Sequence, residues 1–124
     1  MIGATFDSGA LIALEKHDIN MLIKLRVLHR AGVPITIPAN AVVEFWSKGH
    51  GQSAILDLGT VEPLKEPIAK AAGEALAKVQ GATVVDATVM ASAAQRGDRV
   101  FTSDPKDMQR LHGYFRAVAG IIPV

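Results

Sequence analysis

The sequence predicts an α/β sandwich with a mainly parallel sheet, for three reasons. Short apolar segments of strand length alternate along the chain with amphipathic segments of helix length. The 124 residues are about one domain's worth, and 49% of them are hydrophobic against 20% charged, which is a globular composition. No internal repeat, low-complexity tract or linker interrupts the alternation. We therefore expect residues 1–124 to form a single domain.

The expected strands are the short apolar segments, several of which are bounded by proline or by an acidic residue. The first ends at Asp7, and Pro34 and Pro38 bracket the second, where Pro38 suits the first turn of the helix that follows. In chain order the expected strands are Ile2–Phe6, Ile35–Ile37, Thr60–Leu64, Arg99–Thr102 and Ala117–Ile122.

The segments between the strands are expected to be helical, because apolar residues recur in them at intervals of three and four. Gly32 and Gly97 each follow such a segment and are typical helix stops. The expected helices are Ser8–Glu15, Ile19–Arg30, the segment from Pro38 to near Gly49, Gln52–Leu58, a helix that opens at Pro67, Val84–Gln95 and Pro105–Leu111.

The composition excludes several classes of function. No uncharged stretch approaches the roughly 20 apolar residues that a membrane span requires. The N-terminal apolar run has no Lys or Arg before it and contains Asp7, which argues against a secretory signal. The chain has no cysteine, so disulfides and a thiol nucleophile are excluded. With one Trp, one Tyr and four Phe, it has too few aromatic residues to stack single-stranded nucleic acid. We expect a cytoplasmic protein.

Four acidic residues fall where a ligand site is expected. In a parallel sheet, ligands bind beyond the carboxyl ends of the strands, where helices begin. Asp7 and Asp104 follow the first and fourth expected strands. Glu44 and Asp86 lie near the starts of helices in apolar surroundings, where a charge is costly to bury unless something pairs with it. We therefore expect the four carboxylates to share one pocket.

Each acid also has a simpler interpretation. Asp7 and Asp104 suit the N-cap position of the helix that follows each of them. Partial exposure would explain the other two acids, as would a buried partner such as Arg96 or Arg99. A shared pocket explains all four acids together. Because clustered carboxylates repel each other, the pocket predicts a hard divalent cation with oxygen ligands, Mg²⁺ or Mn²⁺ rather than Zn²⁺.

The order of these acids resembles the PIN-domain nucleases, and among them the VapC-type toxins of bacterial toxin–antitoxin pairs. The resemblance is carried by the segments DSGALIAL, VVE, VVDATVMASAA and VFTSDPKDM, which span the chain from Asp7 to Asp107. It implies a PIN-like three-layer sandwich whose sheet has strand order 3-2-1-4-5 and helices on both faces. It also implies a homodimer and a VapB-type antitoxin whose C-terminal tail covers the pocket.

The resemblance also assigns roles to single residues. The positions that match the metal-binding acids of the family are Asp7, Glu44, Asp86 and Asp104. Ser8 and Thr102 match the hydroxyls that brace those acids, and Asp107 falls where many relatives have another polar or acidic residue. Thr83 stands where many relatives carry a further acid. Asn40 lies four residues before Glu44, so it shares that helical face and is a candidate to support the pocket.

The chemistry expected of these residues is metal-assisted hydrolysis of RNA phosphodiester bonds by the toxin of a type II toxin–antitoxin system. Glu44 would be a metal ligand or the base that orients the attacking water. Thirteen Lys and Arg balance twelve Asp and Glu, so setting four acids aside leaves eight and a surface that is basic on average, as RNA binding requires. The candidates for RNA contact are Lys16, Lys24, Arg26, Arg30, Arg96, Arg99, Lys106, Arg110 and Arg116.

Other functions remain possible at this stage. A PIN-like module could bind a partner without cleaving anything, and a related nuclease could act on DNA or in RNA maturation. A phospho-accepting receiver domain has a similar length and an acidic Mg²⁺ site. However, receivers carry adjacent acids after the first strand, an acceptor Asp after the third and a Lys at the end of the fifth. Here the first strand ends in Asp7 alone, the third ends at Pro63–Leu64, and no Lys follows Arg116.

Two large apolar side chains are expected in the core. Trp46 lies two positions past Glu44, about 200° around the helix, so it points away from the acidic pocket. Core packing is its simplest role, and a surface that binds a second copy or an antitoxin is the alternative. Met90 and Ala94 follow Asp86 at helical spacing and are also expected to pack in the core.

Overall fold

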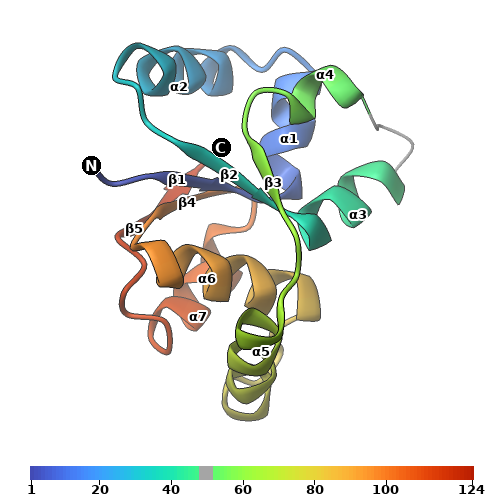
Figure 1. The fold of residues 1–124 in the computed structure, drawn as a ribbon, viewed down its shortest axis with the longest axis vertical. Coiled ribbons are helices and arrows are strands. Elements are labelled where there is room, and N and C mark those ends of the chain that lie inside the picture. Colours follow the sequence, from blue (N-terminus) through green and yellow to red (C-terminus); the bar gives the residue numbers. More distant parts are fainter. Residues whose placement is uncertain (48–51) are drawn as a thin grey trace.

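A computed structural model describes residues 1–47 and 52–124 and contains one five-stranded parallel sheet of order β3-β2-β1-β4-β5. The predicted α/β class and the 3-2-1-4-5 strand order are therefore confirmed (Figure 1). Because all neighbouring strands run parallel, their carboxyl ends meet at one edge of the sheet. The strands are β1 (Ala4–Phe6), β2 (Ile35–Pro38), β3 (Thr60–Glu62), β4 (Arg99–Thr102) and β5 (Gly120–Pro123).

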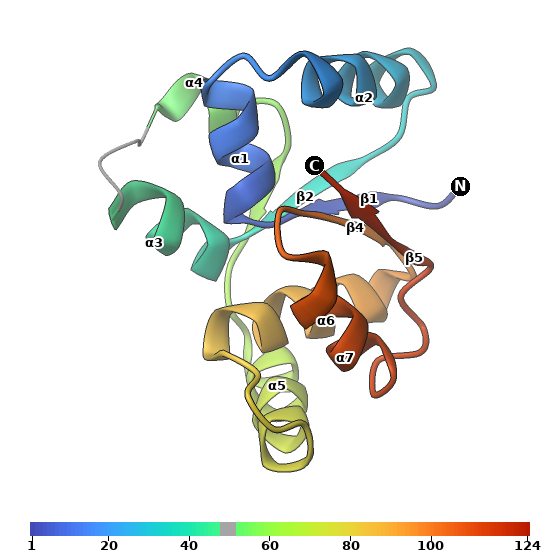
Figure 2. The ribbon, with the colours of Figure 1, turned by 180° about the vertical axis from the view of Figure 1, so that it is seen from behind.

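Helices cover both faces of the sheet, which gives the predicted three layers. Two views from opposite sides show α1, α2 and α4 over one face and α5, α6 and α7 over the other (Figures 1 and 2). Among the described residues, no helix is both long enough and apolar enough to cross a bilayer. The helices are α1 (Ser8–Glu15), α2 (Ile19–Arg30), α3 (Ala39–Ser47), α4 (Ser53–Leu56), α5 (Glu66–Lys78), α6 (Val84–Arg96) and α7 (Pro105–His112).

Several predicted strand boundaries differ from the structure. β1 begins at Ala4 rather than Ile2, and β5 begins at Gly120 rather than Ala117. Pro38 ends β2, where it is paired with Glu62 of β3, instead of opening the next helix. The third strand stops at Glu62 rather than Leu64, because Pro63 has no N–H with which to continue the ladder. The predicted helix end near Gly49 lies outside the described residues.

An apolar layer lies on each side of the sheet. On the side of α1 and α2, Phe6, Leu11 and Met21 are fully buried, and on the side of α6 and α7, Met90 and Met108 are fully buried. Burying one such side chain contributes about 1.5–3 kcal/mol, so the two layers fix both sets of helices on the sheet. The predicted core position of Met90 is confirmed.

The predicted core position of Trp46 is wrong, since its side chain is 48% exposed. In α3 the inward positions are taken by Ala41 and Phe45, which are one turn apart and fully buried. Trp46 is about 100° around the helix from Phe45, and its ring makes an edge contact with the ring of Phe45. Its outer face is left to solvent.

Candidate functional site

Asp7 lies at the carboxyl end of the central strand and is 5% exposed. Its carboxylate caps α1 by accepting a hydrogen bond from the backbone N–H of Ala10 (3.0 Å). The pKa of Asp7 is raised from 3.8 to about 6, mainly by burial and also by the charges of Asp86 and Asp104, while hydrogen bonds from Thr102 and Ala10 oppose the change. Asp7 is therefore both a helix cap and a buried acid beside other acids.

Asp86 lies in the first turn of α6 and is half-buried. Burial raises its pKa, and the charges of Asp104, Glu44 and Asp107 raise it further, while a hydrogen bond with the Thr83 side chain opposes the change. Thr83 is the N-cap of α6, and its hydroxyl accepts a hydrogen bond from the backbone N–H of Asp86 (3.1 Å). Thr83 thus holds the start of α6.

Glu44 reaches the site from α3, where it is tied to α1. The buried hydroxyl of Ser8 donates a hydrogen bond to Glu44 Oε1. Ser8 directly follows Asp7, so this bond holds the Glu44 carboxylate toward the carboxyl end of β1. The charge of Glu44 in turn acts on Asp86, which places the two acids within electrostatic reach of each other.

Asp104 occupies the N-cap position of α7, but its side chain makes no capping hydrogen bond. Its backbone N–H instead donates to the Thr102 hydroxyl (2.9 Å), so the simple capping interpretation does not explain the carboxylate. Asp107, in the first turn of α7, is paired with Arg110 (Oδ1 to Nη2, 2.7 Å). Its charge reaches Asp86 but is partly neutralised by this arginine.

Gly9 allows the start of α1 to lie against the turn that precedes Asp104. A Cβ atom at this position would lie 2.0 Å from the Oγ of Ser103 and 3.0 Å from its backbone nitrogen. Only glycine fits so close an approach. The contact brings the segments of Asp7 and Asp104 together, and sequence reasoning did not identify it.

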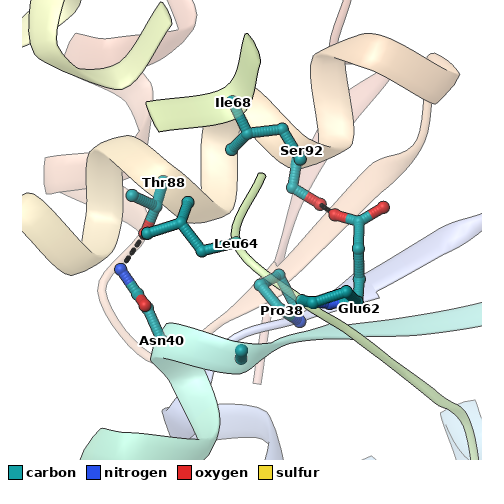
Figure 3. Close-up of a pocket in the computed structure, with 9 residues that line it drawn as sticks. Pro38, Asn40, Glu62, Leu64, Ile68, Thr88 and Ser92 are labelled. Carbon is teal, nitrogen blue, oxygen red and sulfur yellow. Dashed lines mark hydrogen bonds between the residues drawn. The ribbon is translucent and has the colours of Figure 1, made fainter. Parts of the chain in front are cut away.

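Among the hydrogen bonds of the described residues, Asn40 has Thr88 as its side-chain partner rather than Glu44, although Asn40 and Glu44 share a face of α3. The side-chain nitrogen of Asn40 donates to the Thr88 hydroxyl of α6 (3.1 Å), at the wall of a small pocket between α3, α6 and the segment after β3 (Figure 3). Any effect of Asn40 on the acids must therefore pass through α6.

Arg96, a proposed partner for Glu44 or Asp86, is used elsewhere. It bonds Asp98 (Nε to Oδ2, 2.9 Å) and Glu62, and it also donates to Thr5 (3.0 Å). Asp98 is 3% exposed and receives a second hydrogen bond from Thr5 (2.8 Å). We call Arg96, Asp98 and Glu62 the arginine cluster. Sequence reasoning missed this cluster. The available signal was Asp98, which lies directly before an apolar strand, much as Asp7 lies directly after one.

Two of the basic residues predicted to be available for RNA are thus engaged inside the protein. Arg96 belongs to the arginine cluster, and Arg110 bonds Asp107 and the carbonyl oxygen of Gln80 (3.0 Å). The other basic candidates are half-exposed or exposed, and they are Lys16, Lys24, Arg26, Arg30, Arg99, Lys106 and Arg116.

The site acids provide carboxylate oxygens that no Lys or Arg side chain of the described residues neutralises, apart from the pair of Asp107 with Arg110. In the described part of the chain, Asp7, Asp86 and Asp104 form no ion pair with Lys or Arg. Among the described residues, no three His, Asp or Glu side chains lie close enough together to hold a metal ion by themselves. Mg²⁺ commonly binds through one or two carboxylates and keeps several waters, so the donor set suits such an ion.

The fold defines an α/β protein with several acidic side chains near the carboxyl edge of a parallel sheet. No protein family model matches the sequence, and no curated protein matches it. Solved structures do match the fold. A toxin–antitoxin complex from Klebsiella pneumoniae contains a chain with a TM-score of 0.67 and 20% identity, over 85% of this chain and 89% of that chain. PAE2754 from Pyrobaculum aerophilum matches with a TM-score of 0.57 and 19% identity, over 95% and 97% of the two chains. At these identities the likeness establishes a shared fold.

Proposed function

We propose that this protein is a PIN-type endoribonuclease that depends on Mg²⁺ or Mn²⁺ and acts in the cytoplasm as the toxin of a type II toxin–antitoxin pair. The observation that carries the proposal is the state of Asp7. This carboxylate is buried at the end of the central strand, and its pKa is raised to about 6 by that burial first and by the charges of Asp86 and Asp104 in addition. No basic side chain of the described residues pairs with it. Such an arrangement is costly unless a cation from outside binds there.

The likeness to solved structures supports the biological role. A chain of the same fold occurs in the toxin–antitoxin complex from Klebsiella pneumoniae. We therefore propose an antitoxin of the VapB type as the partner that blocks the pocket, and a homodimer as the form that it binds.

In the proposed mechanism, Asp7, Asp86 and Asp104 would hold the cation. A bound Mg²⁺ would polarise the scissile phosphate and lower the pKa of a water molecule. Thr102 holds the Asp7 carboxylate in place by its hydrogen bond. Ser8 holds Glu44 Oε1, and Glu44 Oε2 would accept the proton of the attacking water. The exposed basic residues would bind the RNA backbone.

A growth experiment tests the toxin role. The chain is induced in a bacterium alone, beside its Asp7→Asn variant at the same expression level, and each is also coexpressed with the small protein encoded next to it. We expect the wild type alone to arrest growth and to degrade cellular RNA, and the neighbour to relieve both effects. Arrest by the Asp7→Asn variant, or arrest that coexpression does not change, contradicts the proposal.

A further inference from the structure

A stripe of polar residues runs along α6, which is otherwise an apolar helix. Thr88, Ser92 and Arg96 follow each other at intervals of four, so they share one face. Thr88 is 4% exposed and Ser92 is 1% exposed, among buried residues such as Val89 and Met90. Hydrogen bonds from these residues add directional constraints to the apolar packing that holds α6 on the sheet.

At the C-terminal half of α6 the stripe is bound to the sheet. Ser92 donates to Glu62 Oε1 at the end of β3 and accepts a hydrogen bond from Arg96 Nη2 (2.9 Å) (Figure 3). Arg96 adds its bonds to Glu62 and Asp98. This half of the helix is therefore fixed independently of the acidic pocket.

At the N-terminal half the stripe is bound to α3 through a chain of two hydrogen bonds. Asn40 donates to the Thr88 hydroxyl (3.1 Å), and Thr88 donates to the backbone carbonyl of Val85 (2.8 Å) (Figure 3). The Thr88 hydroxyl thus donates its single proton to Val85 and accepts a hydrogen bond from Asn40. Val85 is the residue before Asp86, and Asn40 lies one turn before Glu44.

This chain of bonds joins the two helices that carry Glu44 and Asp86. The charge of Glu44 raises the pKa of Asp86, and like charges of this kind favour separation of the two helices that carry them. The bond between Asn40 and Thr88 opposes that separation. In the described part of the chain, the hydrogen bonds of these two side chains go to each other and to the carbonyl of Val85 rather than to an acid of the site, so both would act by position.

We propose that the hydrogen bond between Asn40 and Thr88 sets the separation of Glu44 and Asp86 and thereby the affinity of the pocket for a divalent cation. Asn40 and Thr88 are then positioning residues of the nuclease. This inference rests on the proposed function in so far as the pocket binds a metal ion.

The test compares Mn²⁺ binding to the full chain by calorimetry with thermal unfolding in EDTA. Thr88→Val keeps the shape of the side chain but removes both bonds, and we expect the Mn²⁺ dissociation constant to rise about tenfold. Thr88→Ser restores the hydroxyl and should bind Mn²⁺ as the wild type does. Ser92→Ala is the matched control, because it breaks the stripe one turn farther from the acids. It should lower the melting temperature as Thr88→Val does, without changing the Mn²⁺ affinity.

Two results would overturn the inference: wild-type Mn²⁺ affinity in Thr88→Val, or an equal loss of affinity in Ser92→Ala. If Thr88→Val does not fold, Asn40→Ala breaks the same bond from the α3 side, at a residue that is half-exposed. A wild type that binds Mn²⁺ but leaves RNA intact contradicts the proposed function alone, and the variants still decide the positioning role. A wild type that binds no Mn²⁺ contradicts both.

Discussion

Two groups of acidic side chains lie near opposite ends of α6, and they differ in whether an arginine pairs with them. Near the C-terminal end, Asp98 and Glu62 share the guanidinium of Arg96. Near the N-terminal end, Asp7 and Asp86 have raised pKa values, because they are buried and lie among other acids. The comparison teaches that buried acids neutralised within the fold serve its stability, whereas buried acids without an internal cation indicate a site for an external one.

The largest expected effect is the loss of RNA cleavage when Asp7 loses its negative charge. Asp7→Asn keeps an oxygen that can accept the hydrogen bond from Ala10 but removes the negative charge. A bound metal contributes several kcal/mol to such a reaction, so we expect RNA cleavage to fall by at least about a hundredfold. Cleavage of a labelled RNA by equal amounts of folded protein measures this. Activity within a few-fold of the wild type would remove Asp7 from the site.

For the arginine cluster we expect a loss of stability without a loss of activity. Arg96→Met leaves Asp98 and Glu62 without their shared partner, and we expect the free energy of unfolding to fall by about 2–4 kcal/mol. Cleavage by the folded variant should remain. Urea denaturation measures the change. Arg116→Met is the control, since the exposed Arg116 makes a long hydrogen bond to the carbonyl of Gly113 (3.4 Å). A loss of stability no larger than in the control would show that the cluster is not a stabilising element.

The metal-free stability should depend on pH through Asp7. Its pKa is about 6 in the folded protein and 3.8 ordinarily, so the folded state binds the proton more tightly than the unfolded state. The free energy of unfolding should therefore fall as the pH rises from about 4 to about 6, by up to about 3 kcal/mol. In EDTA at pH 7.5, Asp7→Asn should be more stable than the wild type by about 1–3 kcal/mol, and the advantage should shrink at pH 4.5. Denaturation curves for both proteins at both pH values measure this, and a pH-independent difference would contradict it.

The smallest expected change in stability is at Asp104. Because its carboxylate makes no capping hydrogen bond, Asp104→Asn should change the free energy of unfolding in EDTA by a few tenths of a kcal/mol at most. Cleavage should nevertheless drop strongly. Asp107→Asn is the control, since this acid is already paired with Arg110, and it should lose less activity. If Asp104→Asn is fully active and Asp107→Asn is not, Asp107 is the fourth acid of the site.

The sequence predicted the elements of the fold well where local signals define them. The bounds of α2 agree with the prediction, because Asp18 caps its start and Gly32, with a φ of +69°, follows its end. Asp7 and Asp104 could be placed at one edge of the sheet from the sequence, because parallel strands have their carboxyl ends at the same edge. The arginine cluster could not be identified in this way, because the bond between Arg96 and Glu62 joins residues 34 positions apart and depends on the rotation of α6. For the same reason, the partner of Asn40 was visible only in the structure.

The most direct test of the account is RNA cleavage by the purified protein as a function of divalent cation. The protein is treated with EDTA, then supplied with Mg²⁺ or Mn²⁺, beside Asp7→Asn under the same conditions. The account predicts that cleavage stops in EDTA, returns with either ion in the wild type and stays absent in the variant. Cleavage that continues after thorough removal of metal would contradict it.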